Sequence, residues 1–287
     1  MTVSVIPEAK AHLDVARIGS SSFRSTPHPG PATRSYGGDV AGQAVMAASL
    51  TAPAGRPIHS AHMYFLAPGN SSIPIDHEVT ILRDGGSFSA RQVIARQGDS
   101  PIFTMTASFQ TPETGLEHSL RGPQAPGPDE LPTPQELLAG KPEALQWLSW
   151  MRRTADLDVR FVLPPVRAAG LQGETTEPHQ RLWLRHRSLV EPDAMLQAAG
   201  LAYASDVLLL STALGPHAVQ GRFQIATVNH TIWFHRPIRV DEWFLYDQES
   251  TWADRGRALV HGRIFDPEGH LCASIAQEGL IRVKPLG

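Results

Sequence analysis

Residues 193–216 read DAMLQAAGLAYASDVLLLSTALGP, a largely apolar run with a helix start at Asp193 and a helix stop at Gly215 and Pro216. These signals predict one helix through residues 195–214. Stretches in which apolar and polar residues alternate follow it, separated by turn residues. They lie at 226–234, 243–250, 257–265 and 271–283. A buried helix followed by antiparallel hairpins predicts an α+β fold.

The first half of the chain has the same order of elements. A helix is predicted at 36–50, and strands are predicted at 75–82, 89–97 and 102–110. An offset of 169 residues matches Phe65 to Phe234, Pro68 to Pro237 and Ala107 to Ala276. Chance matching is the alternative, because identity between the halves is low. We interpret the chain as a duplicated unit, with copies at 10–111 and 156–287.

The connection between the two units, residues 112–155, is rich in proline and includes GPQAPGPDELPTP at 122–134. Such a segment is typical of an irregular, extended connection. A short helix is predicted within it at 142–153. The stretches 157–162 and 181–190 are predicted to open the second unit, and 16–26 to open the first.

The composition excludes several classes of protein. With 25 basic and 28 acidic residues among 287, the net charge of -3 provides no field that would attract nucleic acid. Cys272 is the only cysteine, which excludes an intrachain disulfide and fits a reducing compartment. The first 15 residues do not resemble a secretory signal. Polar residues interrupt the apolar run 194–214, so it is a poor membrane span, and we expect a cytoplasmic protein.

Common catalytic motifs are absent from the sequence. It contains no GxSxG, GxxxxGK, GxGxxG or HExxH. His59 and His62 are three residues apart on a predicted strand, so they should face opposite sides and not share a metal ion. Cys272 lies within a predicted strand without a companion base, which favours a buried hydrophobic role over a nucleophile. We therefore expect neither a cofactor nor a bound metal.

Asp206 is the most informative polar residue. On the predicted helix it lies in one stripe with Met195, Ala199, Ala202, Leu209 and Ala213. A buried carboxylate must be paired, neutralised or hydrated, so Asp206 is either a structural ion-pair partner or a general base in a cleft. Gln277 is in phase with apolar residues on its strand, and Thr227 is in phase with Ile225, Asn229 and Trp233. Together the three polar residues could hold one water.

Several motifs, in this order, resemble the acyl-CoA thioesterase II family. They are HSAHMYFLAPG (59–69), LRDGGSFSARQVIARQ (82–97), FTMTASFQ (103–110), LAYASD (201–206), QIAT (224–227), WFHRPIRVDEWFLY (233–246) and QEG (277–279). The resemblance implies a double hot-dog fold, in which two antiparallel sheets each wrap around a long central helix. It also implies that the two units are fused as a pseudo-dimer.

The resemblance assigns the catalytic positions to Asp206, Thr227 and Gln277. It implies hydrolysis of fatty acyl-CoA by a water that Asp206 deprotonates, while Thr227 and Gln277 orient that water. The sequence departs from the family where DHS is usual, because residues 229–231 read NHT here. Backbone N–H groups near Gly37 and Gly38, at the entry of a predicted helix, are candidate donors to the oxyanion.

Two other functions remain open from the sequence. A hot-dog hydratase or dehydratase would need a histidine beside Asp206, and His230 or His62 could approach it in space. A non-catalytic acyl-CoA-binding protein is the other alternative, against which the presence of all three polar residues argues. The expected partners are an acyl-CoA substrate and, by analogy with other hot-dog proteins, further copies of the chain in a homo-oligomer.

Overall fold

The computed structural model describes residues 12–28, 33–188, 191–220 and 223–283. Its strands form one antiparallel sheet in the order β1-β2-β4-β5-β6-β3-β9-β12-β11-β10-β8-β7. The first-half elements are β1 (Val15–Arg17), β2 (Ser22–Ser25), α2 (Gly37–Ser49), β3 (Ile58–Phe65), β4 (Asp76–Asp84), β5 (Phe88–Gln97) and β6 (Ser100–Gln110). The second-half elements are β7 (Leu157–Phe161), α5 (Val166–Leu171), β8 (His179–His186), α6 (Ala194–Ser205), η2 (Leu210–His217), β9 (Phe223–Phe234), β10 (Phe244–Asp254), β11 (Arg257–Phe265) and β12 (Leu271–Val283).

The two halves join edge to edge in the middle of this sheet. Strand β3 pairs antiparallel with β9, with Ala61 opposite Ile232 and Met63 opposite His230. The expectation of two separate sheets is therefore wrong. Pairing β3 with β9 satisfies backbone groups that two exposed sheet edges would leave without partners. From this join outward, the strands follow the same order in both halves.

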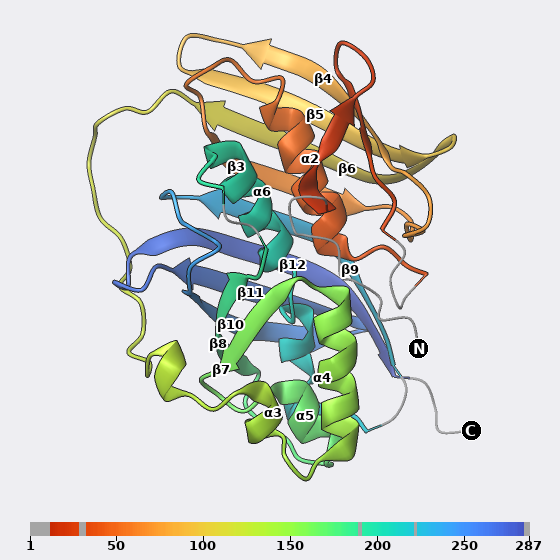
Figure 1. Ribbon diagram of the computed structural model, residues 1–287, viewed down its shortest axis with the longest axis vertical. Helices are drawn as coiled ribbons and strands as arrows, with labels where there is room; N and C mark the ends of the chain where they lie inside the picture. The colour runs from red at the N-terminus through yellow and green to blue at the C-terminus, as the bar shows by residue number, and fades with distance from the viewer. Residues whose placement is uncertain (1–11, 29–32, 189–190, 221–222, 284–287) are drawn as a thin grey trace.

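Helices α2 and α6 pack against each other in front of the sheet (Figure 1). Their backbones approach closely because glycines lie at the contact. A Cβ atom on Gly42 would lie 2.9 Å from the carbonyl oxygen of Ala199, and one on Gly38 would lie 2.4 Å from that of Tyr203. The two central helices therefore touch directly, at the level of the join between the halves.

Helix α6 ends at Ser205, nine residues before the predicted end at residue 214, so that prediction is wrong. Side chains of β10 donate hydrogen bonds to carbonyl oxygens that would accept backbone N–H groups in a longer helix. The Tyr246 hydroxyl donates to the Ser205 oxygen at 2.6 Å, and Gln248 Nε2 donates to the Val207 oxygen at 2.9 Å. Leu208 then adopts a φ of 57°, which an α-helix cannot accommodate. The chain continues as the 3-10 helix η2.

The shorter helix also changes the predicted stripe. Met195, at its start, is 38% exposed, and Leu209 and Ala213 lie beyond the end of α6. Asp206 is the residue that caps α6, not one in the middle of a helix. By length and composition the segment Ala194–His217 could cross a membrane, but 78% of its most apolar window is buried inside the protein.

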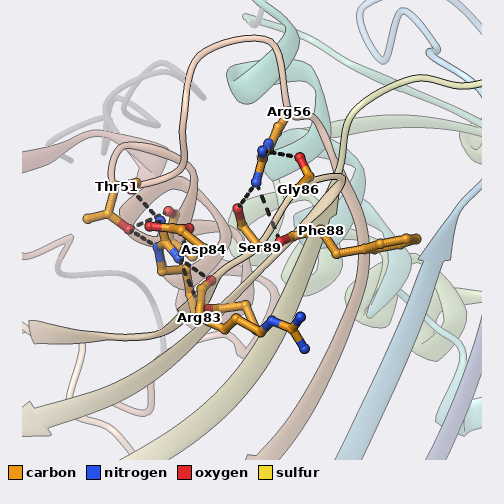
Figure 2. A network of polar contacts seen from close by, with 10 residues as sticks. Thr51, Arg56, Arg83, Asp84, Gly86, Phe88 and Ser89 are labelled. Carbon is orange, nitrogen blue, oxygen red and sulfur yellow. Dashed lines mark hydrogen bonds and ion pairs between the residues drawn. The ribbon is translucent and has the colours of Figure 1, made fainter.

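A polar network fixes the opposite end of α2 to the β4–β5 hairpin (Figure 2). The fully buried guanidinium of Arg91 donates to the Thr51 carbonyl oxygen at 2.8 Å and to Asp84 Oδ1 at 2.8 Å. Arg56 donates to Ser89 Oγ and to the Gly86 carbonyl oxygen. Arg91 therefore binds the turn that follows α2, where a cation is favoured by the helix dipole.

The connection between the halves contains η1 (Pro128–Glu130), α3 (Pro134–Leu137) and α4 (Pro142–Thr154). Helix α4 agrees with the helix predicted at 142–153. Thr133 and Glu136 form a capping box at the start of α3, since each side chain bonds the backbone N–H of the other. The stretch predicted as a strand at 181–190 includes residues 189–190, which lie outside the described residues.

Candidate functional site

Asp206, Thr227 and Gln277 lie in hydrogen-bond contact with one another. Thr227 Oγ1 donates to Asp206 Oδ1 at 3.2 Å, and Gln277 Nε2 donates to the same oxygen at 3.0 Å. Gln277 Nε2 also lies 2.6 Å from Thr227 Oγ1. The structure thus brings together the three residues that the sequence singled out, from the end of α6, from β9 and from β12.

A β-bulge in β9 directs Thr227 toward Asp206. Asn229 pairs with Glu278 and Thr227 pairs with Gly279, so Val228 is an additional residue on β9. A bulge changes which side of a sheet the following side chains face. The prediction that Thr227 shares a face with Asn229 and Trp233 is therefore wrong. Asn229 Nδ2 instead donates to Glu278 Oε2.

The two oxygens of the Asp206 carboxylate have different surroundings. Oδ1 accepts the hydrogen bonds from Thr227 and Gln277, whereas none of the hydrogen bonds of the described residues ends on Oδ2. Oδ2 faces the first residue of α2, and a Cβ atom on Gly37 would lie 2.6 Å from it. Phe65 lies beside the same point. Glycine at position 37 therefore leaves the space in front of Oδ2.

The positive end of the α2 dipole lies at this space. Tyr36, which precedes α2, makes no side-chain cap, so the first N–H groups of the helix are not satisfied by that side chain. The predicted oxyanion donors near Gly37 and Gly38 thus lie beside Asp206. If the oxyanion of a transition state formed in front of Gly37, the N–H groups at the start of α2 could stabilise its negative charge without reorienting.

Two tyrosines, Tyr36 and Tyr246, bond backbone oxygens next to the carboxylate. The Tyr246 hydroxyl bonds the carbonyl oxygen of Ser205, and the Tyr36 hydroxyl bonds that of Tyr203. Burial, reinforced by the charge of Asp206, raises the pKa of both Tyr36 and Tyr246 well above the usual range. Both phenols therefore stay neutral at ordinary pH.

His230 also lies at this site, where the side chain of Gln277 links it to Asp206. Its ring is 1% exposed, and Nδ1 lies 3.3 Å from Gln277 Oε1. Burial lowers the pKa of His230, while the charge of Asp206 opposes that shift. From the sequence, His230 was considered only as the histidine that a hydratase or dehydratase would need beside Asp206. No local sequence signal places it there, because the bulge that turns both Thr227 and His230 to the inner face is defined by the pairing of β9 with β12.

The other singled-out residues lie apart from the site. His62 is bonded to Thr231 on the outer face, so it does not approach Asp206. His59 bonds Ser108 Oγ at 2.8 Å. Burial raises the pKa of Cys272 to about 11, which keeps its thiol protonated and agrees with a buried hydrophobic role.

Among the described residues, one group has the spacing of metal ligands: Asp266, Glu268 and His270, in the turn between β11 and β12. Asp266 already accepts from the Nδ1 and from the backbone N–H of His270. These contacts explain the group as a turn-stabilising arrangement. It lies in a different part of the fold from Asp206.

Two family profiles cover most of the chain. The profile described as acyl-CoA thioesterase matches residues 152–280, and that described as acyl-CoA thioesterase N-terminal domain matches residues 25–110. Human acyl-coenzyme A thioesterase 8 is 37% identical over 95% of this chain and 88% of its own length. Acyl-CoA thioesterase 2 of Haemophilus influenzae is 37% identical over 94% of this chain and 95% of its own length.

Solved structures agree with these matches. The acyl-CoA thioesterase II TesB2 from Mycobacterium marinum superposes with a TM-score of 0.78 and 36% identity, covering 96% of this chain and 98% of that one. A hot-dog protein from Alicyclobacillus acidocaldarius has a TM-score of 0.75 at 18% identity, covering 96% of this chain and 98% of its own, and so supports the fold alone. The hot-dog fold and the predicted family are confirmed. The chain belongs to the acyl-CoA thioesterase family.

Proposed function

We propose that Asp206, Thr227 and Gln277 activate the water with which this enzyme hydrolyses acyl-CoA thioesters. The observation that carries the proposal is the asymmetry of the Asp206 carboxylate. Oδ1 is held by two donors, and Oδ2 faces the N-terminus of α2. A base held in this way keeps one oxygen available for a water proton.

The reaction begins with a water hydrogen-bonded to Asp206 Oδ2. The water oxygen attacks the thioester carbonyl carbon while its proton passes to Oδ2, and the carbonyl becomes an oxyanion. N–H groups near Gly37 and Gly38 stabilise that charge. The intermediate then collapses, the carbon–sulfur bond breaks, and the CoA thiolate takes the proton from Asp206. The products are a free acid and CoA, and no covalent enzyme intermediate forms.

In this mechanism Thr227 and Gln277 hold the base as well as the water. Their side-chain hydrogen bonds at the site go to Asp206 Oδ1, to each other or to His230. Fixing the carboxylate reduces the reorganisation needed in the transition state. This role extends the one that the family resemblance implies, in which the two residues orient water.

The substitution Asp206→Asn tests the proposal. It preserves shape and removes the base, so kcat should fall at least about 100-fold, or about 3 kcal/mol in barrier. Release of free CoA thiol from acetyl-, hexanoyl-, decanoyl- and palmitoyl-CoA is the measurement. Asp254→Asn is the matched control, because Asp254 is exposed at the β10–β11 turn and should leave kcat unchanged. An undiminished rate for Asp206→Asn would overturn the assignment.

We also infer that the two halves are copies of one hot-dog unit, fused as a pseudo-dimer with boundaries at 10–111 and 156–287. The β3–β9 register supports this proposal, since His62 pairs with Thr231, 169 residues later, and Ser60 and Tyr64 pair with Trp233 and Asn229 about that point. The offset of 169 thus agrees with a two-fold relation between β3 and β9.

The offset differs in the last strands. Ala61 pairs with Ala107, and the position that corresponds to Ala61, His230, pairs with Gln277. Ala107 therefore corresponds to Gln277 by an offset of 170, and the match of Ala107 to Ala276 is wrong by one residue. A sequence comparison without gaps cannot detect this single-residue shift.

Three further properties stay proposals. We propose a cytoplasmic location, which the single buried cysteine supports. We propose fatty acyl chains as the substrate class, and a homo-oligomeric assembly. Light scattering coupled to size exclusion measures the assembly directly, and a monomer would contradict it.

A further inference from the structure

We propose that His230 is a positioning residue that fixes the orientation of the Gln277 amide in the thioesterase reaction. The inference rests on the proposed function, because it assigns a partner to one member of the Asp206 site. Among the described residues, no hydrogen bond joins His230 directly to Asp206.

The side chain of His230 lies between two elements of the site. Nδ1 lies 3.3 Å from Gln277 Oε1 on β12, and Nε2 lies 2.8 Å from Ser205 Oγ at the end of α6. Ser205 directly precedes Asp206. With the one proton of the neutral ring on Nδ1, Nε2 accepts the hydroxyl proton of Ser205, which is then not donated to the Ala202 carbonyl oxygen 2.8 Å away. The ring therefore bridges the strand that carries Gln277 and the helix end that carries Asp206.

The donors and the acceptor of the Gln277 amide explain the importance of His230. Its Nε2 offers two hydrogens, which go to Asp206 Oδ1 and Thr227 Oγ1. Its Oε1 can only accept, so the neighbouring Nδ1 of His230 must carry a proton. If the amide flipped, Oε1 would oppose the Asp206 carboxylate and Nε2 would oppose the Nδ1 proton. One N–H from His230 thus selects the orientation in which Gln277 donates to the base.

The β-bulge in β9 places His230 beside Gln277. The additional residue Val228 turns Thr227 and His230 to the same side, although they are three residues apart. His230 is then the direct cross-strand partner of Gln277. Side chains opposite each other on one face of an antiparallel pair are close enough to interact.

A double-mutant cycle tests the proposal on the full-length enzyme. His230→Leu removes the donor, so kcat should fall about 10- to 100-fold with little change in KM, since a misplaced group at a reacting centre costs that order of rate. In the Gln277→Ala background the same substitution should cause almost no further loss, because His230 acts through Gln277. Equal losses in both backgrounds would show an independent or merely structural role and overturn the proposal.

A conservative variant tests the chemistry of the contact. The Asn side chain carries an N–H on the atom after Cγ, as the histidine ring does at Nδ1, so His230→Asn should restore most of the kcat lost in His230→Leu. Equal impairment of both variants, with thermal unfolding as in the wild type, would contradict the positioning role. The matched control is His235→Leu. His235 also bonds a serine of β12, Ser274, but outside the site, and kcat should not change.

One readout needs no variant. Nitrogen-15 NMR of the histidine rings should show His230 protonated at Nδ1, and protonation at Nε2 alone would overturn the proposal. The cycle and the NMR measurement report on the His230–Gln277 contact, whereas Asp206→Asn reports on the base. Failure of the positioning role and failure of the proposed function are therefore distinguishable.

Discussion

The two halves of the sheet have the same architecture but different side chains at corresponding positions. Asp206 caps α6, where Leu50 caps α2. By the pairing of β3 with β9, Thr227 corresponds to Ile58 and His230 to Ala61, and Gln277 corresponds to Ala107. The second half thus carries four polar groups where the first carries four apolar ones.

A β-bulge occurs at corresponding positions in both halves. Strand β3 has a register shift between Ile58 and Ser60, which makes His59 an additional residue, as Val228 is in β9. The bulge alone therefore does not create the site. The fold therefore provides the same backbone geometry in both halves, whereas only the second half carries the polar side chains of the proposed chemistry.

The largest effect after loss of the base is expected at Gly37, the residue of the first half that meets the polar site of the second. In Gly37→Ala, the new Cβ would lie 2.6 Å from Asp206 Oδ2, which is the end of a flexible side chain. The carboxylate must move, so kcat should fall about 100-fold, while the melting temperature should change little. Gly86→Ala is the control, since its Cβ would meet nothing within 4 Å. Wild-type kcat in Gly37→Ala would argue against Oδ2 as the working oxygen.

A smaller effect is expected when Thr227 is made apolar like its counterpart Ile58. Thr227→Val keeps the shape and removes the donor to Asp206 Oδ1. A hydrogen bond to a charged group contributes about 1.5–3 kcal/mol, so kcat should fall about 10- to 100-fold. Steady-state kinetics with decanoyl-CoA measures this, and Thr227→Ser should recover most of the rate. Equal kcat values for Thr227→Val and Thr227→Ser would show that the Thr227 hydroxyl has no role in the reaction.

The smallest effect concerns stability, and there the halves should behave alike. Each half contains a buried histidine that contacts its central helix: His77 lies 3.3 Å from Gln43 of α2, and His186 bonds the Gly200 oxygen of α6. Burial lowers the pKa of each to about 4, from an ordinary value of 6.5. The folded state thus binds fewer protons than the unfolded state between these values. Stability is present above pH 6.5 and is lost as the pH falls toward 4.

Between pH 7 and pH 5 each histidine should cost about 2 kcal/mol of unfolding free energy. Urea unfolding at the two pH values measures the total. His186→Gln keeps a donor for the Gly200 oxygen and should reduce the loss of unfolding free energy between pH 7 and pH 5 by about 2 kcal/mol. An unaltered pH dependence in this variant would show that the pKa of His186 is the same in the folded and unfolded protein.

The sequence predicted most of the strands, the presence of both central helices and the proximity of Asp206, Thr227 and Gln277, because periodicity, turn residues and family motifs are local. The end of α6 could not be predicted in this way. Tyr246 and Gln248 of β10 take the carbonyl oxygens of Ser205 and Val207, and these contacts span 41 residues. Local propensity continues the helix through Asp206, whereas tertiary hydrogen bonds end it.

The role of His230 was hidden for a similar reason. Strict alternation assigns Thr227 and His230 to opposite faces, and only the partner strand β12 reveals the additional residue Val228. The single sheet was also not predictable, because the β3–β9 pairing joins segments about 169 residues apart. Register and sheet joining depend on partners that one strand's sequence does not specify.

The central claim is that hydrolysis uses the polar site of the second half and not the corresponding place in the first. The most direct test compares kcat of Asp206→Asn with that of Leu50→Asn, the same new side chain at the two helix ends. We predict a loss of at least about 100-fold for Asp206→Asn and wild-type kcat for Leu50→Asn. Equal rates in the two variants would contradict it.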